Sequence, residues 1–356
     1  MKKKILIFTD AFSGGGAEEV MNFFSDKLQE EYYVLHISKW LGPKNINLPK
    51  WKKTLNKKTS KQCIPDLYKI IKKFQPDLVL SATGHNNIIV LFLKVLFLNK
   101  FKVIIRESSV ASEMKKFSVK SRLLDQVLVK PLYKSANKII TQSRDMYNDL
   151  LENYKLNPSK LVIINNPIIN NPQFDGTLIK NNDKIVLLNI GRFSNEKGHF
   201  RLMEILKKLP ENFFLKLMGD GLLKKEIISY AKKIQVYHRI EFLGFLDEEK
   251  KVEEIKRADI YVQTSFVEGF PNSLLQAISY GLPVIAFNVK GGTKEIINDK
   301  NGMLVTDNDI TGFVEKLKNT NWKSFDKDSM TEDINQRFGE ETIIKKIKQL
   351  IENEFK

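Results

Sequence analysis

Arg192, Lys197 and Glu268 are charged residues whose types and spacing could form a site for a phosphorylated ligand. Arg192 and Lys197 flank a glycine-bounded turn between Gly191 and Gly198, and Glu268 lies in a later loop. A diphosphate that leaves during group transfer needs cations; arginine supplies planar donors and lysine supplies a point charge. A carboxylate could accept hydrogen bonds from hydroxyl groups. Spacing alone leaves a second interpretation open, in which these are solvated side chains on ordinary turns.

The sequence around Glu268 predicts the elements that would position it. Residues 259–264 are rich in β-branched and aromatic residues and predict a buried strand. After the loop that holds Glu268, Asn272 is expected to cap a helix that runs to Tyr280. Gly281 would end this helix in the left-handed conformation. Residues 284–287 then predict the next strand.

This pattern of strand, loop and helix predicts a ligand site, because ligands bind beyond the carboxyl ends of strands in an open parallel sheet. Glu268 would lie at that edge. The free backbone amides near Asn272, Ser273 and Leu274 would face the same crevice and suit phosphate oxygens. Gln276, one turn into the helix, would face roughly the same way.

The residues of this stretch resemble the nucleotide-sugar signature of retaining glycosyltransferases of family 4, the group 1 glycosyltransferases, which have the two-domain GT-B fold. The signature has two glutamates separated by seven residues, around Gly-Phe-Pro-Asn-Ser-Leu-Leu. Here the first is Glu268, and Gln276 occupies the second position. The resemblance implies that the first acid holds sugar hydroxyls and that the second position holds the ribose. A glutamine can accept one hydrogen bond but cannot make the stronger charge-assisted one.

The turn from Gly191 to Gly198 resembles the diphosphate-binding loop of the same family and precedes Glu268 in the expected order. The resemblance implies that Arg192 and Lys197 are donor ligands that stabilise the leaving phosphate. Together with weaker resemblances in other loops, it implies the following donor-binding residues: Gly15, Gly16, Gly191, Arg192, Lys197, Gly219, Gly221, Phe245, Glu268, Gly269, Phe270, Asn272, Ser273, Leu274 and Gln276.

The first half of the chain also alternates strands and helices. Residues 4–9 and 32–38 predict strands, and residues 18–31 predict an amphipathic helix between them. Glycines 14 to 16 could bring the backbone close to a phosphate, although the full dinucleotide fingerprint is missing. Family members often carry Gly-Gly-Ala-Glu here, as residues 15–18 do, and the resemblance implies that this loop lies over the donor from the opposite domain.

Glu107 follows a predicted strand, residues 102–105, at the edge that would face a crevice. It could orient a reacting hydroxyl or relay its proton, and it is a candidate catalytic residue beside Glu268, Arg192 and Lys197. The alternative is a surface pair with Arg106. Relatives often place Glu-His here, whereas this chain has Glu107-Ser108, so no catalytic histidine can be carried over.

The alternation predicts an α/β protein with two doubly wound Rossmann-like domains that face each other across a cleft. Proline, asparagine and glycine concentrate between residues 165 and 183, as in an interdomain connection. We therefore expect an acceptor-side domain of residues 1–167 and a nucleotide-sugar-binding domain of residues 168–336. Residues 337–356 would form a helix that returns to the first domain, as in other GT-B folds.

The formal charge of +16 favours anionic partners, namely nucleic acid, phosphorylated ligands or anionic lipid. The densest basic cluster is Lys50, Lys52, Lys53, Lys57, Lys58 and Lys61, near Trp40 and Trp51. This composition suits a membrane surface, or equally a solvated lysine-rich loop. No nucleic-acid motif is present.

The single cysteine, Cys63, suits a reducing compartment. The longest apolar run, residues 88–98, is well short of the roughly 20 residues that span a bilayer. The amino-terminal apolar run is too short for a secretory signal. We therefore expect a cytoplasmic protein that is peripheral to the inner face of the cell membrane.

No cofactor and no metal are expected. Asp307-Asn308-Asp309 fits the short pattern used by metal-dependent glycosyltransferases of another fold, but it lies far along the chain from the other motifs. His85 and His199 are single histidines without metal-ligand spacing. Arg192, Lys197 and a helix start could take the place of Mg²⁺.

The predicted activity is retaining transfer of a sugar from a nucleotide-sugar, most simply a UDP-sugar. The acceptor would be a glycan or lipid-linked oligosaccharide in the synthesis of O-antigen, capsule or glycoprotein glycan. Without an evident carboxylate pair for double displacement, we expect same-face attack as the sugar leaves. Two alternatives stay open: a sugar-nucleotide epimerase or hydrolase of the same fold, and a non-catalytic nucleotide-binding subunit of a transferase complex.

Overall fold

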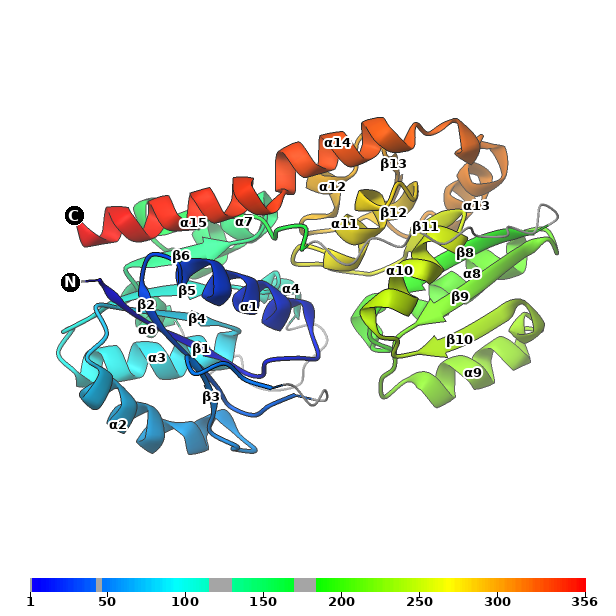
Figure 1. Ribbon diagram of the computed structural model, residues 1–356. Helices are drawn as coiled ribbons and strands as arrows, with labels where there is room; N and C mark the ends of the chain where they lie inside the picture. Colours follow the sequence, from blue (N-terminus) through cyan, green and yellow to red (C-terminus); the bar gives the residue numbers. More distant parts are fainter. Residues whose placement is uncertain (1, 43–46, 115–129, 170–183) are drawn as a thin grey trace. The chain divides into compact units, whose positions relative to one another are not determined.

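The structure is a computed structural model that describes residues 2–42, 47–114, 130–169 and 184–356 (Figure 1). The chain divides into two compact units. Unit 1 comprises Met1–Pro167 with Glu341–Lys356, and unit 2 comprises Ile168–Glu340. Most of the predicted proline- and asparagine-rich connection lies outside the described residues.

Unit 1 is built on a seven-stranded sheet in which all neighbouring strands are parallel, in the order β3-β2-β1-β4-β5-β6-β7. These strands are buried on both faces, so they read as continuous apolar runs such as Ile5–Phe8. Their bounds are β1 (Lys4–Thr9), β2 (Tyr33–Ser38), β3 (Lys52–Thr54), β4 (Leu78–Ala82), β5 (Lys102–Arg106), β6 (Lys138–Thr141) and β7 (Leu161–Ile163).

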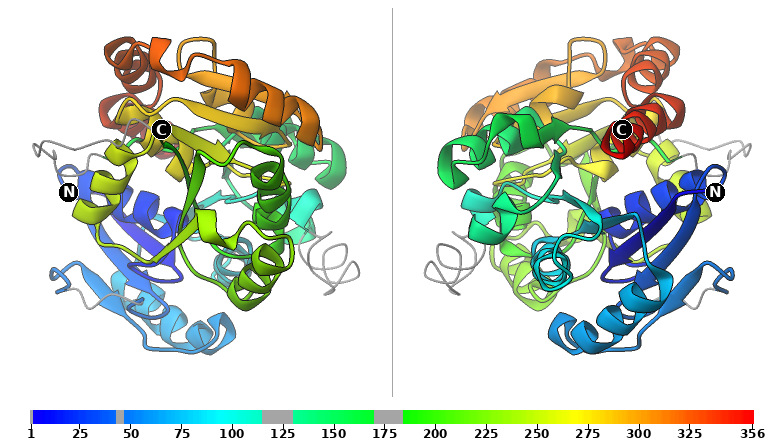
Figure 2. Two further views of the ribbon diagram at one scale, coloured as in Figure 1. Left: turned by 90° about the vertical axis from the view of Figure 1, so that its right-hand side faces the viewer. Right: turned by 90° about the vertical axis from the view of Figure 1, so that its left-hand side faces the viewer.

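Helices cover both faces of the unit 1 sheet (Figures 1 and 2). Helices α2, α3, α6 and α7 share one apolar core with inward side chains of the strands, such as Leu6 and Phe8 of β1. Helices α1 and α15 lie on the other face. The bounds are α1 (Gly16–Leu28), α2 (Ile64–Phe74), α3 (Gly84–Leu96), α4 (Ala111–Met114), α6 (Lys130–Lys134), α7 (Arg144–Tyr154), α15 (Glu340–Phe355), η1 (Ser60–Cys63) and η4 (Pro158–Lys160).

The carboxyl-terminal helix differs from the prediction that it begins at Arg337. Helix α14 (Lys327–Phe338) ends at Phe338, and α15 begins at Glu340, because Gly339 between them is extended, with φ −61° and ψ 158°. Ile343, Ile347 and Ile351 of α15 are buried. The apolar face of α15, and not sequence continuity with α14, therefore attaches the end of the chain to unit 1.

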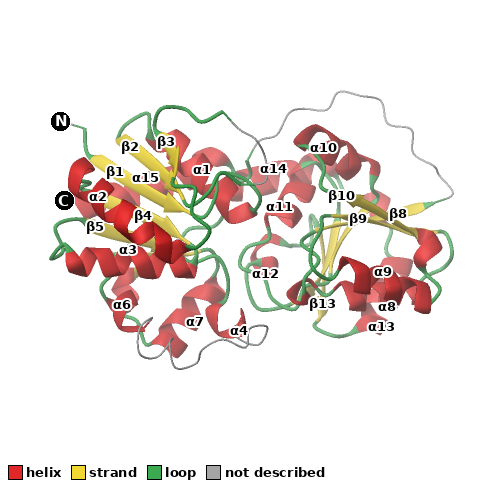
Figure 3. Ribbon diagram, turned by 90° about the horizontal axis from the view of Figure 1, so that it is seen from below, coloured by secondary structure: helices red, strands yellow, loops and turns green. Residues whose placement is uncertain are grey.

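Unit 2 contains a six-stranded parallel sheet in the order β10-β9-β8-β11-β12-β13. Figure 3 shows its strands in yellow among red helices. The strands are β8 (Ile185–Ile190), β9 (Phe213–Met218), β10 (Ile240–Gly244), β11 (Ile260–Gln263), β12 (Val284–Asn288) and β13 (Gly302–Thr306). The remaining helices are α8 (His199–Lys208), α9 (Lys224–Lys233), α10 (Glu248–Arg257), α11 (Asn272–Ser279), α12 (Thr293–Ile296), α13 (Ile310–Asn319), η5 (Asn195–Lys197), η6 (Tyr237–Arg239) and η7 (Trp322–Ser324).

Each sheet has a topological switch point, where successive strands are added to opposite sides of the first one. In unit 1 it lies between β1 and β4, and in unit 2 between β8 and β11. In doubly wound sheets the segments that follow such strands run to opposite faces, and ligands bind at this point. The predicted class of two doubly wound Rossmann-like units is confirmed.

The helix after Glu268 differs from its prediction by one residue. Asn272 is the first helical residue of α11, and Pro271 occupies the N-cap position. Gly281 follows the helix with φ 71°, as its left-handed role requires. Within the part of the chain that the structure describes, no helix has both the length and the apolar character needed to cross a bilayer.

Candidate functional site

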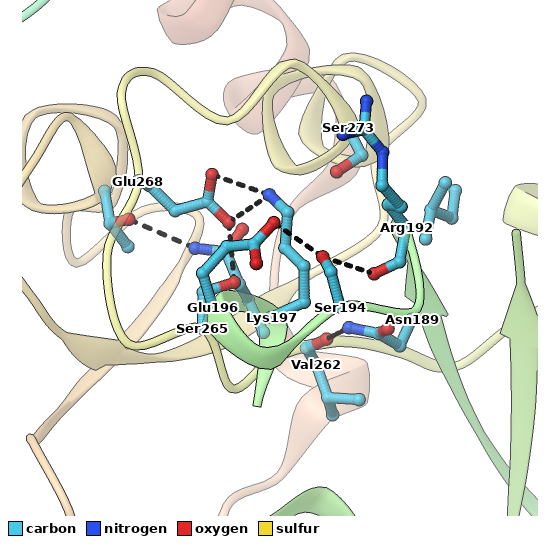
Figure 4. Close-up of polar contacts among 12 residues, drawn as sticks. Asn189, Arg192, Ser194, Glu196, Lys197, Val262, Ser265, Glu268 and Ser273 are labelled. Carbon is cyan, nitrogen blue, oxygen red and sulfur yellow. Dashed lines mark hydrogen bonds and ion pairs between the residues drawn. The ribbon is translucent and has the colours of Figure 1, made fainter. Parts of the chain in front are cut away.

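An ion pair between Lys197 and Glu268 lies at the switch point of unit 2 (Figure 4). Lys197 ends η5 in the loop after β8, and Glu268 lies in the loop after β11. Lys197 Nζ donates to both carboxylate oxygens of Glu268, at 2.7 and 2.9 Å. The two residues predicted to hold a diphosphate and a sugar are therefore in contact, although 71 residues separate them in the chain.

The Glu268 carboxylate is buried and held from two sides. Its side chain is 8% exposed, while that of Lys197 is 28% exposed. Ser265 Oγ donates to Glu268 Oε1 at 2.6 Å, so three hydrogen bonds reach one carboxylate. A buried carboxylate is tolerated only when it is paired and hydrogen-bonded. Lys197 is the more exposed partner, so its ammonium is the member of the pair that solvent or a ligand can reach.

Hydrogen bonds to main-chain carbonyls hold the two loops together. Phe266 N donates to Glu196 O at 2.8 Å, and Thr264 Oγ1 donates to Gly198 O at 3.1 Å. The backbone amide of Glu268 itself donates to Lys290 O at 3.1 Å. Gly291 has φ 127°, and a Cβ there would lie 1.7 Å from Glu268 O. Only glycine allows the segment after β12 to support Glu268 this closely.

Arg192 lies in the same loop as Lys197, but its guanidinium is exposed. In Figure 4 its side chain points toward Ser273, at the start of α11, and away from the Lys197–Glu268 pair. No hydrogen bond from this guanidinium is present among the described residues. The structure therefore brings Lys197 and Glu268 into contact. Arg192, in the same loop as Lys197, is a separate, exposed cation.

The start of α11 is fastened to the end of β8. The Tyr261 hydroxyl lies 2.8 Å from Ser273 Oγ and donates to Ile190 O at 3.3 Å. Burial raises the pKa of Tyr261, so this hydroxyl remains a donor. Among the predicted donor residues here, Phe270 and Leu274 are buried in the apolar core and can offer only backbone groups. Gln276 is half-buried one turn further along.

The other predicted donor residues of unit 2 follow β8, β9, β10 and β11. Gly191 N donates to Met218 O at 3.0 Å, and a Cβ on Gly219 would lie 2.1 Å from Gly191 O. The glycine at 219 is thus explained by close packing against the Lys197 loop. Gly221 lies next to that contact, and Phe245 is 80% exposed just beyond β10. Gly269 O accepts from Gly292 N at 2.8 Å.

The predicted residues of unit 1 occupy different positions. Gly15 is the N-cap of α1 and Gly16 is its first residue. Glu107 is buried and accepts hydrogen bonds from the Tyr133 hydroxyl and, at 3.0 Å, from Asn87 Nδ2. Burial raises the pKa of Glu107, although these bonds oppose the shift. The alternative of a surface pair with Arg106 is wrong, because both side chains are buried.

The described residues contain no group of three or more His, Cys, Asp or Glu side chains that could hold a metal ion. Asp307 and Asn308 instead accept hydrogen bonds from Arg201 Nη1, at 2.7 and 3.0 Å. Asp309 caps α13 by accepting from Gly312 N at 2.8 Å. The Asp-x-Asp pattern therefore has a structural explanation in this chain.

Comparison with known families identifies the class of protein. Residues 171–322 match the family described as "Glycosyl transferases group 1", and residues 15–169 match the family described as "Glycosyltransferase Family 4". Together the two matches cover most of the chain, and each falls on one doubly wound unit. The chain belongs to the group 1 glycosyltransferases of family 4, and its fold is GT-B.

Individual relatives are similar at moderate identity. An uncharacterized glycosyltransferase of Methanocaldococcus jannaschii is 28% identical over 301 residues, which are 76% of this chain and 72% of the relative. The N-acetylgalactosamine-N,N'-diacetylbacillosaminyl-diphospho-undecaprenol 4-alpha-N-acetylgalactosaminyltransferase of Campylobacter jejuni is 26% identical over 228 residues, 63% of this chain and 61% of that protein. The crystal structure of Anabaena Alr3699/HepE in complex with UDP and glucose superposes with a TM-score of 0.78 at 18% identity, covering 99% and 100% of the two chains.

Arg201 is a residue that the sequence did not single out and that holds the Glu268 loop in place. It is 7% exposed, and its guanidinium carbon lies 4.0 and 4.2 Å from the ring centres of Phe266 and Phe287. Its nitrogens donate to Thr264 O and Ser265 O. A planar fork between two aromatic rings fixes these carbonyls in a way that lysine cannot. Arg201, at α8, gave no sequence signal, because its partners follow β11 and β13.

We expect Arg201→Lys to loosen the Glu268 loop by removing the stacked, forked contacts. Hydrogen exchange of the amides of residues 264–268 should accelerate markedly, and the free energy of unfolding should fall by about 1–3 kcal/mol. Arg239→Lys is the matched control, since Arg239 is 3% exposed and also donates to carbonyls, those of Leu206, Leu209 and Pro210. Equal acceleration of residues 264–268 in both variants would contradict the role of Arg201.

Proposed function

We propose that this protein is a retaining glycosyltransferase that transfers a sugar from a UDP-sugar to a glycan or lipid-linked acceptor without a metal ion. The observation that carries the proposal is the buried Lys197–Glu268 pair at the switch point of unit 2. A cation for a diphosphate and a carboxylate for sugar hydroxyls lie in contact there, within a family whose members transfer sugars.

The leaving diphosphate is stabilised by fixed positive charge. The Lys197 ammonium shares its hydrogen bonds between Glu268 and the phosphate next to the sugar. The exposed Arg192 guanidinium supplies a second, planar donor. The amino end of α11, next to Ser273, offers backbone amides to the other phosphate. The bond between the anomeric carbon and the phosphate oxygen then breaks as negative charge grows on that oxygen.

Glu268 acts as a sugar ligand and not as a covalent nucleophile. Both of its oxygens already accept hydrogen bonds, from Lys197 and Ser265, which stabilises the anion and weakens it as a nucleophile. The acceptor hydroxyl therefore attacks from the face that the diphosphate leaves, and a phosphate oxygen takes its proton. Attack on the same face retains the anomeric configuration.

The choice of UDP is supported by the likeness to a fold that binds UDP in Anabaena Alr3699/HepE. The lipid-linked acceptor is supported by the Campylobacter jejuni relative, whose name places a diphospho-undecaprenol in its substrate. Acceptors of this kind belong to the synthesis of cell-surface polysaccharides and glycoprotein glycans. The protein would then work at a membrane surface.

One face of unit 1 suits an anionic membrane. Phe92, Val95 and Leu96 at the end of α3, with Leu98 just beyond it, are 47, 50, 53 and 80% exposed; we name them the α3 apolar ridge. Residues 84–106 contain no Asp or Glu. Exposed lysines are present on α2 and α6, which both pack against α3, and in the loop after α3: Lys69, Lys72, Lys73, Lys100 and Lys134. Exposed apolar side chains with lysines on the neighbouring elements favour anionic lipid.

The basic cluster between residues 50 and 61 is a weaker membrane candidate than its composition indicated. Lys52 pairs with Asp26 at 2.7 Å and its side chain is only 9% exposed. Lys57 pairs with Asp66 at 3.0 Å. Part of the local charge is thus neutralised within the fold, so the α3 apolar ridge is the better location for contact with lipid.

Lys197→Ala should lower transfer at saturating donor by about a hundredfold or more, because a cation is lost where charge develops on the leaving group. Label transfer from a panel of radioactive UDP-sugars into solvent-extracted membrane lipids measures it. Lys224→Ala removes the same charge from an exposed pair with Asp220 and serves as the control. Wild-type turnover of the Lys197 variant, with an unchanged melting temperature, would refute this mechanism.

Nucleotide choice and the role of Gln276 can be measured together. UDP at a hundred times its Kd should stabilise the protein by about 2.7 kcal/mol, and GDP and ADP should do so less. Gln276→Glu should tighten UDP binding by about fivefold, since a carboxylate accepts ribose hydroxyls more strongly than an amide does. Calorimetry measures the affinity of the wild type and of the variant for UDP. Inorganic diphosphate lacks the ribose, so the variant should bind it no more tightly than the wild type does. An equal gain in affinity for diphosphate, or no gain for UDP, contradicts the ribose contact.

The membrane contact predicts that the protein floats with vesicles of anionic phosphatidylglycerol at low salt and much less with phosphatidylcholine. Leu96→Ser with Leu98→Ser should reduce the bound fraction more than tenfold, since each buried leucine contributes about 1.5–3 kcal/mol. Leu222→Ser is the control, because Leu222 is 96% exposed in unit 2. Failure of the wild type to float, or equal loss in the control, removes the membrane from the proposal.

A further inference from the structure

Unit 1 has its own cluster of titratable side chains at its switch point. Asp10 follows β1, Lys39 follows β2 and His85 follows β4. Asp10 accepts from Lys39 Nζ at 2.7 Å and from His85 Nε2 at 2.8 and 2.9 Å. Asp10 and His85 therefore follow the two strands that flank the switch point, where ligands bind in such sheets, and Lys39 pairs with Asp10 from the segment after β2.

Two members of the cluster are largely buried, and the third is exposed to solvent. The side chains of Asp10 and Lys39 are 17 and 15% exposed, whereas that of His85 is 54% exposed. Burial alone would raise the pKa of Asp10, but hydrogen bonds from His85 and Lys39 outweigh it and lower the pKa to about 2. Asp10 is therefore an anion throughout the physiological range, and it orients the one ring that solvent and ligands can reach.

Thr83, which precedes α3, stores backbone strain beside this cluster. It has φ 72° and ψ 137°, a combination that a β-branched residue rarely adopts. Its hydroxyl does not cap α3 but faces Asp10 Oδ2 at 3.4 Å, and it accepts from Asn86 Nδ2 at 3.1 Å. Asn86 Oδ1 is buried without a hydrogen-bond partner in the described structure. Strain of this kind persists where the surroundings fix a functional geometry.

The polar groups of the cluster suit a hydroxyl-bearing ligand. The charge of Lys39 is offset by Asp10. Nε2 of His85 contacts Asp10, so Nδ1 is the ring nitrogen left for a ligand. A sugar hydroxyl can either donate a hydrogen bond to Nδ1 or accept one from it. An uncharged hydroxyl, unlike a phosphate, is also not repelled by the Asp10 carboxylate.

We propose that Asp10, Lys39 and His85 form a binding site for a sugar hydroxyl, and that the sugar belongs to the acceptor. The assignment to the acceptor rests on the proposed function, whereas the sugar site stands on its own geometry. His85 contacts the sugar, and Asp10 and Lys39 position His85.

The same helix connects this site with the α3 apolar ridge. His85, Ile88, Phe92 and Leu96 follow one another at spacings of three or four residues, so they lie on one side of α3. At 1.5 Å per residue, His85 lies roughly 16 Å along the helix axis from Leu96. A sugar at His85 would thus sit a short, fixed distance from a lipid surface at the ridge, which suits a lipid-linked acceptor.

Ring resonances of the four histidines provide the test, with methyl α-glycosides of glucose, galactose, N-acetylglucosamine and N-acetylgalactosamine as probes. At least one glycoside should shift the His85 ring resonances in a saturable manner. His238, an exposed histidine 3.1 Å from Glu211 Oε2 in unit 2, is the matched control and should not move. His36 and His199 are buried and report on the fold. A response to inorganic phosphate alone, or to no sugar, would overturn the proposal.

Variants separate binding from folding. His85→Gln and Asp10→Asn should each weaken the responding glycoside by about tenfold, as expected for loss of one oriented hydrogen bond. In transfer assays His85→Gln should raise KM for the acceptor far more than it lowers kcat. His238→Gln should change neither. Unchanged glycoside affinity in His85→Gln, with a melting temperature equal to that of the wild type, contradicts the site.

Binding of UDP distinguishes failure of this site from failure of the proposed function. UDP binding with no sugar response at His85 would remove the sugar site and leave the transferase proposal intact. A saturable sugar response at His85 without UDP binding would do the reverse. Binding of both, with wild-type KM for the acceptor in His85→Gln, would show that the sugar at this site is not the acceptor.

Discussion

The burial of the Glu268 carboxylate constrains the rest of unit 2. A carboxylate at 8% exposure must be paired, and Lys197 and Ser265 are its partners. To bring Lys197 there, the loop after β8 must follow the loop after β11 closely. Arg201 and Gly291 each hold the Glu268 loop in place, Arg201 with a stacked guanidinium and Gly291 by the absence of a side chain.

The two units solve the same problem in the same place. Each parallel sheet has a switch point, and at each one a hydrogen-bonded pair of side chains joins the segments that follow the first strand and its neighbour across that point. In unit 2 the exposed member is a lysine, which suits an anion. In unit 1 it is a histidine beside an ionised aspartate, which suits a hydroxyl. The two pairs therefore differ in chemistry, although the architecture that positions them is the same.

A sequence pattern can have partners in the fold that the pattern itself does not predict. Asp307 and Asp309 have the spacing of a metal motif, yet Asp309 caps α13, and Asp307 accepts from Arg201, which in turn holds the Glu268 loop. Glu107, which follows β5, is buried in unit 1, where Tyr133 and Asn87 donate hydrogen bonds to it. The deciding partners of Asp307 and Glu107 come from distant parts of the chain.

The sequence by itself determined the alternation of strands and helices, because buried parallel strands are continuous apolar runs. The resemblance to family motifs singled out Lys197 and Glu268 as candidate site residues. It also located the end of α11, because Gly281 and Pro283 act locally. The break at Gly339, the burial of Arg106 and Glu107, and the contacts of Arg201 and His85 were decided only by the tertiary structure. Those features depend on residues dozens of positions apart, and their proximity follows from the order in which the strands pair.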